Sequence, residues 1–259
     1  MEVFANPDAW VALLTLTFLE IILVIDNIIF ITIVTGKLPE EKRKKATRVG
    51  LFLAMFMRIA LLFGITVLIA MKAPWFTIDW GWFSGSFTGQ AMVLFFGGLF
   101  LIYKSTKEIH EKVDHKGDEE KDLKKSAAKS FGNVIFQILL IDLIFSVDSI
   151  LTAVGMTNGI EGAIYIMVTA VVISVGVMML FAIPVGNFVN ANPSIQILGL
   201  AFLILIGFML ITESMHLSNA ELVGQHVGAV PKGYLYFAIA FSLAVEFINM
   251  KMRKKNGHS

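Results

Sequence analysis

The sequence predicts an all-α, polytopic membrane protein with seven transmembrane helices, arranged as a 3+3 inverted-topology repeat plus one additional helix. Of the 259 residues, 56% are apolar and only 16% are charged, whereas about a quarter of residues carry charge in soluble domains. Apolar runs of membrane-spanning length recur along most of the chain, whose mean hydropathy is +0.76. A water-soluble globular protein is excluded, and we expect one integral membrane domain over residues 1–259.

The spans follow from apolar stretches of roughly 20 residues. They lie near residues 10–35, 48–71, 88–103, 131–154, 161–186, 194–214 and 233–250. The third is the weakest, because polar residues dilute its start and Lys104 ends it early, but AMVLFFGGLFLIY is too apolar for a loop. Pro184 and Pro193 bracket the connection between the fifth and sixth spans and are expected to end helices there.

Basic residues orient the chain. Six of them lie in the loop between the first two spans, eight between the third and fourth, and four at the C-terminus. The segments on the other side hold only Lys72 and Lys232, and Arg58 lies inside the second span. Since loops rich in Lys and Arg stay in the cytoplasm, we expect a multi-pass inner-membrane protein with its N-terminus outside and its C-terminus inside. All four tryptophans then fall at or beside the outer interface.

The segment at about 105–130 is expected to be a charged cytoplasmic loop between the two repeats. It mixes both signs of charge and reads as a solvated helix or linker with i,i+4 pairs. Its histidines, His110 and His115, would contact a cation only weakly. Repeat one then covers about 8–104, repeat two about 131–217, and the additional helix about 233–250.

The repeat is visible in an acidic motif. LEIILVIDN at 19–27 aligns with IDLIFSVDS at 141–149, and GLFLI at 98–102 faintly echoes GFMLI at 207–211. The alignment matches three positions, namely Glu20 with Asp142, Asp26 with Asp148, and Asn27 with Ser149. Three spans per copy invert the second copy relative to the first, which is the plan of many secondary transporters, whose sites lie at the repeat interface near the midplane.

Six acidic residues fall within the predicted spans, against Arg58 alone as a base. They are Glu20, Asp26, Asp142, Asp148, Glu213 and Glu246. Charges in a bilayer are costly and mark ion routes, so we expect a cation site. The competing interpretation is that several acids are protonated and only hydrogen-bonded between helices, while Arg58 neutralises one more.

Helix geometry leaves two arrangements open. Glu20 and Asp26 lie about 120° apart and roughly 9 Å along a regular helix, so both reach one ion only if the helix breaks near the second acid. In the alternative, the helices stay regular, Asp26 and Asp148 meet across the pseudo-two-fold axis, and Glu20 and Asp142 form flanking steps.

The donor types indicate the class of cation. Carboxylates together with Asn27 and Ser149, and no cysteine, favour hard cations such as Mg²⁺, Ca²⁺ or Mn²⁺. His216 lies three residues after Glu213 and is either a nitrogen ligand, which would favour Mn²⁺, or an outer-interface pair with Glu213. The sequence holds no nucleotide-binding or catalytic motif, so we expect neither an enzyme nor a tightly bound cofactor, and no nucleic-acid partner.

These motifs resemble the TerC family of integral membrane proteins, which includes Alx-like members and is grouped with the lysine-exporter-like transporters. The match is carried by LEIILVIDN, LPEEKRKKATRVG, GLFLIYKSTKEIH, IDLIFSVDSI and YLYFAIAFSLAVEFIN. The resemblance implies seven helices, metal-ion homeostasis through Mn²⁺ efflux, and a historical association with tellurium resistance. It also implies an ion site lined by Glu20, Asp26, Asn27, Asp142, Asp148 and Ser149, with Glu213 and Glu246 nearby.

The leading hypothesis is therefore a secondary transporter that exports a divalent cation, Mn²⁺ first, in exchange for protons. Two alternatives belong to other classes. One is a membrane partner that helps to insert or metallate exported proteins, with the acids serving helix packing. The other is an exporter of an organic cation or amino acid.

Overall fold

The computed structural model describes residues 7–114, 131–157 and 159–256, without the side chains of 23–26, 65, 66, 68, 114 and 254–256. The first half contains α1 (Pro7–Thr35), α2 (Glu40–Phe63), α3 (Ile65–Ala70), β1 (Pro74–Asp79), β2 (Phe83–Thr88) and α4 (Gly89–Asp114). The second half contains α6 (Phe131–Met156), α7 (Ala163–Ala191), α8 (Pro193–Leu217), β3 (Glu221–Leu222), β4 (Gln225–His226) and α9 (Lys232–Asn256). His115 and most of the predicted loop at 105–130 lie outside the described residues.

Six helices in the described part of the chain are long and apolar enough to cross a membrane: α1, α2, α6, α7, α8 and α9. The predicted third span is present as α4, but it does not meet the same hydropathy criterion. Gly89 and Gln90 begin this helix, and charged residues follow from Lys104, so its apolar centre is short. The expected count of seven spans is therefore not confirmed on composition, although a helix exists at each predicted position.

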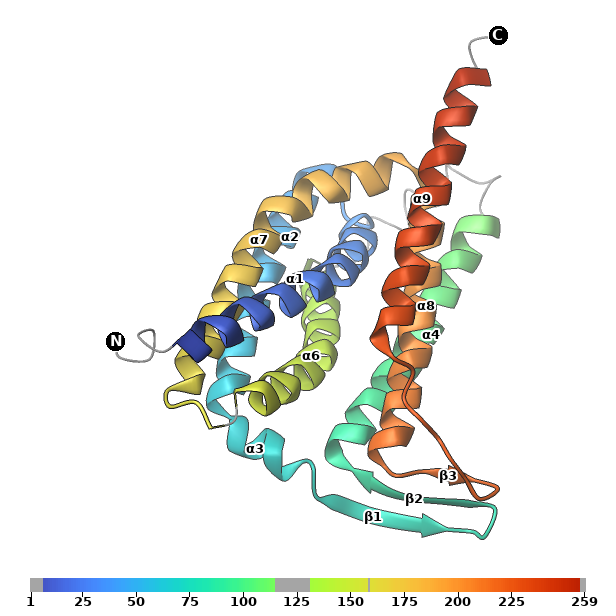
Figure 1. The fold of residues 1–259 in the computed structure, drawn as a ribbon. Coiled ribbons are helices and arrows are strands. Elements are labelled where there is room, and N and C mark those ends of the chain that lie inside the picture. Colours follow the sequence, from blue (N-terminus) through green and yellow to red (C-terminus); the bar gives the residue numbers. More distant parts are fainter. Residues whose placement is uncertain (1–6, 115–130, 158, 257–259) are drawn as a thin grey trace.

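The helices form two groups (Figure 1). In the first, α1 packs along α7 and contacts α6, while α2 packs against α6 and α7; in the second, α4 packs along α8, which also contacts α9. Smaller contacts of α1 with α8 and of α4 with α6 join the groups. Many large apolar side chains on these helices stay exposed, among them Phe18, Phe56, Leu180 and Phe241. Such surfaces are suited to hydrocarbon rather than water.

Proline shapes two helices, one of them against expectation. Pro193 is the first residue of α8, where its missing N–H costs nothing. Pro184 was expected to end the preceding helix, but it lies inside α7, which continues to Ala191. In a membrane helix, neighbouring helices and local adjustment of the backbone allow a proline to be tolerated.

Between α3 and α4, the chain forms strands that the all-α prediction did not include. The sheet is antiparallel, in the order β1-β2-β3-β4, and lies at the end of the molecule opposite the C-terminal end of α9 (Figure 1). Aromatic residues hold it: the rings of Phe76 and Phe87 stack with centroids 5.3 Å apart. Three of the four tryptophans, Trp75, Trp80 and Trp82, are exposed on or beside β1 and β2.

The charged end of α4 is part of the fold rather than a free linker. Glu108 is buried, and it pairs with Lys37 in the α1–α2 connection and, at 3.0 Å, with Lys104 one turn earlier. These ion pairs extend α4 well beyond the predicted span end at residue 103. The loop predicted at 105–130 is therefore helical up to Asp114.

Two glycines bring α4 and α8 into close contact. A Cβ atom placed on Gly98 would lie 2.5 Å from the carbonyl oxygen of Gly207, and one placed on Gly207 would lie 2.7 Å from that of Gly98. Small residues allow such close backbone approach in membrane helices. Ser214 adds a hydrogen bond of 2.6 Å from its Oγ to the carbonyl oxygen of Ala91. The two segments that echo each other in sequence, 98–102 and 207–211, thus meet face to face.

This contact gives a stability prediction. Gly98→Leu should lower the free energy of unfolding by about 1–3 kcal/mol, because the obstructing atom is backbone and cannot move aside without shifting a helix. Thermal unfolding of the detergent-purified protein measures the change. Gly176→Leu on α7 is the matched control, because a Cβ there meets no atom within 4 Å. An equal decrease in thermal stability for Gly98→Leu and Gly176→Leu would contradict the interpretation that Gly98 is needed for the close contact of α4 with α8.

Candidate functional site

The first acids of the two sequence repeats meet at one arginine in the protein interior. Arg58 Nη1 donates to Glu20 Oε2 at 2.5 Å, and Nη2 donates to Asp142 Oδ1 at 2.5 Å. Arg58 Nε also lies 3.0 and 3.1 Å from the two Asp142 oxygens. Ser146 supports this group, with its Oγ donating to the Asp142 carbonyl oxygen. All three charged side chains are buried, so each depends on the others for its charge compensation.

This arrangement changes the role expected for Glu20 and Asp142. Asp142 lies near the middle of α6, at about 16 Å from its first residue and about 21 Å from its last. The expected midplane ion ligands are therefore held by a guanidinium instead. In the competing interpretation Arg58 neutralises one acid, whereas here it bridges two. Because the pairing is bidentate toward Asp142 and fully enclosed, we interpret the group as a packing element that joins α1, α2 and α6.

The helix-break arrangement is wrong. α1 is continuous from Pro7 to Thr35, and α6 is continuous from Phe131 to Met156. Glu20 and Asp26 are therefore on different sides of a regular helix, as are Asp142 and Asp148. The side chain of Asp26 lies outside the described residues, so its expected meeting with Asp148 stays a prediction.

Asp148 and Glu213 share a cavity of about 300 Å³ near the sheet end of the molecule. The lining includes Lys72, Thr88, Gln90 and Thr152 as further polar residues. Asp148 lies about 12 Å before the end of α6 and Glu213 about 6 Å before the end of α8. The shared acidic site is therefore close to one end of the bundle and not at its centre.

The Asp148 carboxylate already forms an ion pair with a lysine. Lys232, the first residue of α9, donates to Asp148 Oδ2 at 2.5 Å, with the side chains 45% and 16% exposed. Lys72 lines the same cavity and forms no ion pair with another residue in the described part of the chain. Sequence reasoning missed both lysines as site residues. They are the two basic residues predicted on the outer side, and that isolation was the available signal.

The remaining predicted ligands are dispersed. Asn27 is buried and its Nδ2 lacks a hydrogen-bond partner among the described residues, whereas the Ser149 hydroxyl donates to the Ser146 carbonyl oxygen at 3.4 Å. Glu246 lies on α9, about 21 Å along that helix from Lys232, with a buried Oε1 that has no partner among the described residues. These residues do not join the Asp148 cavity.

His216 contacts a second histidine, and among the described residues no cluster of metal ligands surrounds it. Its ring centroid lies 5.8 Å from that of His226 in β4. Within residues 7–114, 131–157 and 159–256, no three His, Asp or Glu side chains are grouped closely enough to hold a metal ion. The acids predicted as one site are thus found in separate places: the Arg58 group, the Asp148 cavity, and Glu246 on α9.

Comparison with known proteins supplies the family. A family profile described as "Integral membrane protein TerC family" matches residues 5–257. This chain belongs to the TerC family. The TerC assignment covers nearly every residue and agrees with the resemblance carried by the acidic motifs.

One relative of similar length is named as an inner membrane protein. The chain is 48% identical to "UPF0053 inner membrane protein YgdQ" of Escherichia coli K12, over 97% of this chain and 96% of that protein. It is 44% identical to a "UPF0053 protein" of Haemophilus influenzae, over 98% of each. Another relative, E. coli "UPF0053 inner membrane protein YoaE", is 41% identical, but the match covers 45% of its length. No solved structure matches the chain. As a TerC-family integral membrane protein, the chain contacts the lipid bilayer.

Proposed function

We propose that this TerC-family protein is a secondary transporter that exports a divalent cation, with Mn²⁺ favoured, across the inner membrane. The observation that carries the proposal is the cavity that Asp148 and Glu213 both line near the end of the helices. Thr88, Thr152 and Gln90 add neutral oxygens to its lining. Carboxylate, hydroxyl and amide oxygens are the ligand types that hard divalent cations take.

The helix packing supports an inverted-repeat interpretation with α4 as a seventh span. If α1, α2 and α4 correspond to α6, α7 and α8, then each corresponding pair is in contact: α1 with α6, α2 with α7, and α4 with α8. The contact of α1 with α7 likewise has its counterpart in that of α2 with α6. Such matched contacts are expected around a pseudo-two-fold axis in transporters.

Under this interpretation, the second acids lie on opposite sides of the central Arg58 group. Asp148 lies toward the sheet end, and Asp26, nine residues before the end of α1, lies toward the opposite end. With the basic loop in the cytoplasm, the N-terminus outside and the C-terminus inside, position 26 lies nearer the inner side and position 148 nearer the outer side. The transported cation is a substrate, and carboxylates that bind either a proton or a metal support exchange for protons. The proposed role involves no catalysis.

Lys232 should act as a tethered competitor for the cation. Its ammonium holds the Asp148 carboxylate, so a cation that binds from the outer side must displace it. Lys232→Gln should therefore lower the external Mn²⁺ concentration that half-inhibits efflux by several-fold, roughly as expected for loss of a partly exposed ion pair of up to 1 kcal/mol. Inhibition of efflux from proteoliposomes by external Mn²⁺ measures this.

Lys72→Gln is the matched control for this experiment. It removes the same charge from the same cavity but breaks no ion pair with a described residue. Indistinguishable curves for the two variants would mean that only the overall field of the cavity matters and that Lys232 does not compete for Asp148.

The deciding test is a flux assay with the purified full-length protein in liposomes, across a panel of Mn²⁺, Mg²⁺, Ca²⁺ and Zn²⁺. The proposal expects saturable movement of Mn²⁺ that a proton gradient drives. Absence of flux for every ion, together with co-purifying proteins, would favour the assembly-partner alternative.

A second candidate function is favoured by the balance of charge in the same cavity. Asp148, Glu213 and Lys72 line the cavity, and Lys232 pairs with Asp148. The cavity volume is at the lower end of the range for small-molecule sites. A zwitterionic solute such as an amino acid is complementary to this pattern. Competition of amino acids with Mn²⁺ in the flux assay distinguishes the two substrates.

A further inference from the structure

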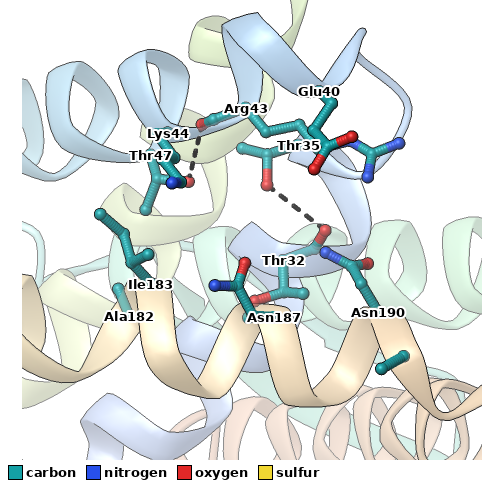
Figure 2. Close-up of a pocket in the computed structure, with 12 residues that line it drawn as sticks. Thr32, Thr35, Glu40, Arg43, Lys44, Thr47, Ala182, Ile183, Asn187 and Asn190 are labelled. Atoms are coloured by element: carbon teal, nitrogen blue, oxygen red, sulfur yellow. Dashed lines mark hydrogen bonds between the residues drawn. The ribbon is translucent and has the colours of Figure 1, made fainter.

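A second cavity, of about 390 Å³, lies at the opposite end of the helices between α1, α2 and α7. Figure 2 shows its polar side chains: Thr32 and Thr35 from the end of α1, Arg43 and Lys44 from the start of α2, and Asn187 and Asn190 from α7. The Asp148 cavity shares none of these residues. Nothing in the proposed transport step uses this cavity.

Arg43 and Lys44 are positioned to donate hydrogen bonds to a ligand in this cavity. Arg43 Nε is fixed by a hydrogen bond of 2.8 Å to the Leu38 carbonyl oxygen, which leaves both Nη atoms available. Lys44 forms no ion pair with any described residue, and it lines the cavity on the side opposite the Arg43 guanidinium (Figure 2). Among the described residues of the lining, Glu40 is the one acid, so two cationic side chains accompany one anionic side chain.

Neutral polar groups from all three helices also line this cavity. Asn187 and Asn190 lie one turn apart on α7 and bring side-chain amides, each with a donor nitrogen and an acceptor oxygen, to the wall opposite α2 (Figure 2). The hydroxyls of Thr35 and Thr47 donate to the carbonyl oxygens of Ile31 and Arg43, so they give the cavity acceptor oxygens only. A divalent cation would meet Arg43 and Lys44 here, whereas an anion would gain charge-assisted bonds from both.

We infer that this cavity binds a phosphate-bearing anion. The cavity volume is within the range of small-ligand sites, which suits a phosphate group with a small organic substituent. Basic pockets between membrane helices on the cytoplasmic side hold the headgroups of anionic lipids in this way. An anionic phospholipid and a free phosphate compound share the recognised chemistry, and the experiment separates them.

The test measures ligand-dependent thermal stability of the full-length protein in detergent. Phosphatidylglycerol and inorganic phosphate are titrated separately, with phosphatidylcholine and chloride as their respective references. Arg43→Gln combined with Lys44→Gln should raise the concentration for half-maximal stabilisation roughly tenfold or more, because two charge-assisted contacts are lost. Stabilisation by phosphatidylglycerol assigns a lipid headgroup, and stabilisation by inorganic phosphate alone assigns a soluble phosphate compound.

Lys42→Gln combined with Lys45→Gln is the matched control. These two lysines are exposed on the same helix and lie outside the cavity lining, so the pair removes the same charge from the same loop. Asn187→Leu removes a donor without changing charge, and it tests the site should the Arg43/Lys44 pair fail to fold. Equal weakening in both lysine-containing pairs, an unaltered response in Asn187→Leu, or no stabilisation of the unmodified protein by either phosphate probe would overturn the inference.

Discussion

Arg58→Gln is expected to destabilise the protein by about 3–5 kcal/mol, the range for removing one partner of a buried ion pair. The variant leaves Glu20 and Asp142 buried side by side without their shared counter-charge. Yield of monodisperse protein and thermal unfolding in detergent measure the loss. Arg48→Gln, which removes an exposed arginine from the same helix, should have little effect.

A neutral replacement of the whole group provides a sharper test of the same interpretation. Arg58→Met combined with Glu20→Gln and Asp142→Asn removes all three charges together, so no carboxylate stays uncompensated. Since neutral replacements of buried ion pairs are often tolerated, this triple variant should recover most of the stability lost in Arg58→Gln. A triple variant that is as unstable as the single one would show that the charges themselves are required.

Asp148→Asn should abolish Mn²⁺ release from loaded proteoliposomes while leaving the melting temperature within a few degrees of the unmodified protein. The amide keeps the size of the side chain but removes the charge that a divalent cation needs. Because Asp148 is partly exposed and near a helix end, loss of its lysine partner should cost little stability. Asp26→Asn, its counterpart in the sequence repeat, should lose transport as well.

Glu161→Gln is the control for both transport variants. Glu161 is an exposed acid in the connection between α6 and α7, outside the residues that line the Asp148 cavity. It should transport as the unmodified protein does. If Asp148→Asn and Asp26→Asn both release Mn²⁺ as fast as the unmodified protein, the proposed mechanism is wrong.

The site could be predicted only in part. Acids inside apolar runs marked the important positions, because few reasons other than function or ion pairing keep a carboxylate in a membrane. Sequence spacing also showed that Glu20 and Asp26 cannot share one ion on a regular helix, and the helices are indeed continuous. Sequence spacing did not reveal that Arg58 bridges Glu20 and Asp142. That pairing depends on which face each of α1, α2 and α6 turns toward the others when the helices pack.

Two fold features also escaped the sequence pattern for physical reasons. The strands at 74–88 are short and rich in aromatic residues, so they read as an outer loop beside the membrane until pairing with β3 is known. The first turns of the predicted loop at 105–130 are helical because buried Glu108 pairs with Lys37, a partner 71 residues away. Contacts of that kind leave no local periodicity to detect.

The sequence by itself determined the membrane class, the position of each long helix and the family, because bilayer insertion and helix length depend on local hydrophobicity. Only the tertiary structure decided which acids are compensated and which remain available. Glu20 and Asp142 are enclosed around Arg58, whereas Asp148 and Glu213 line an accessible cavity next to Lys232. The cost of a buried charge depends on the partners that packing brings within a few ångströms, and those partners come from helices far apart in the chain.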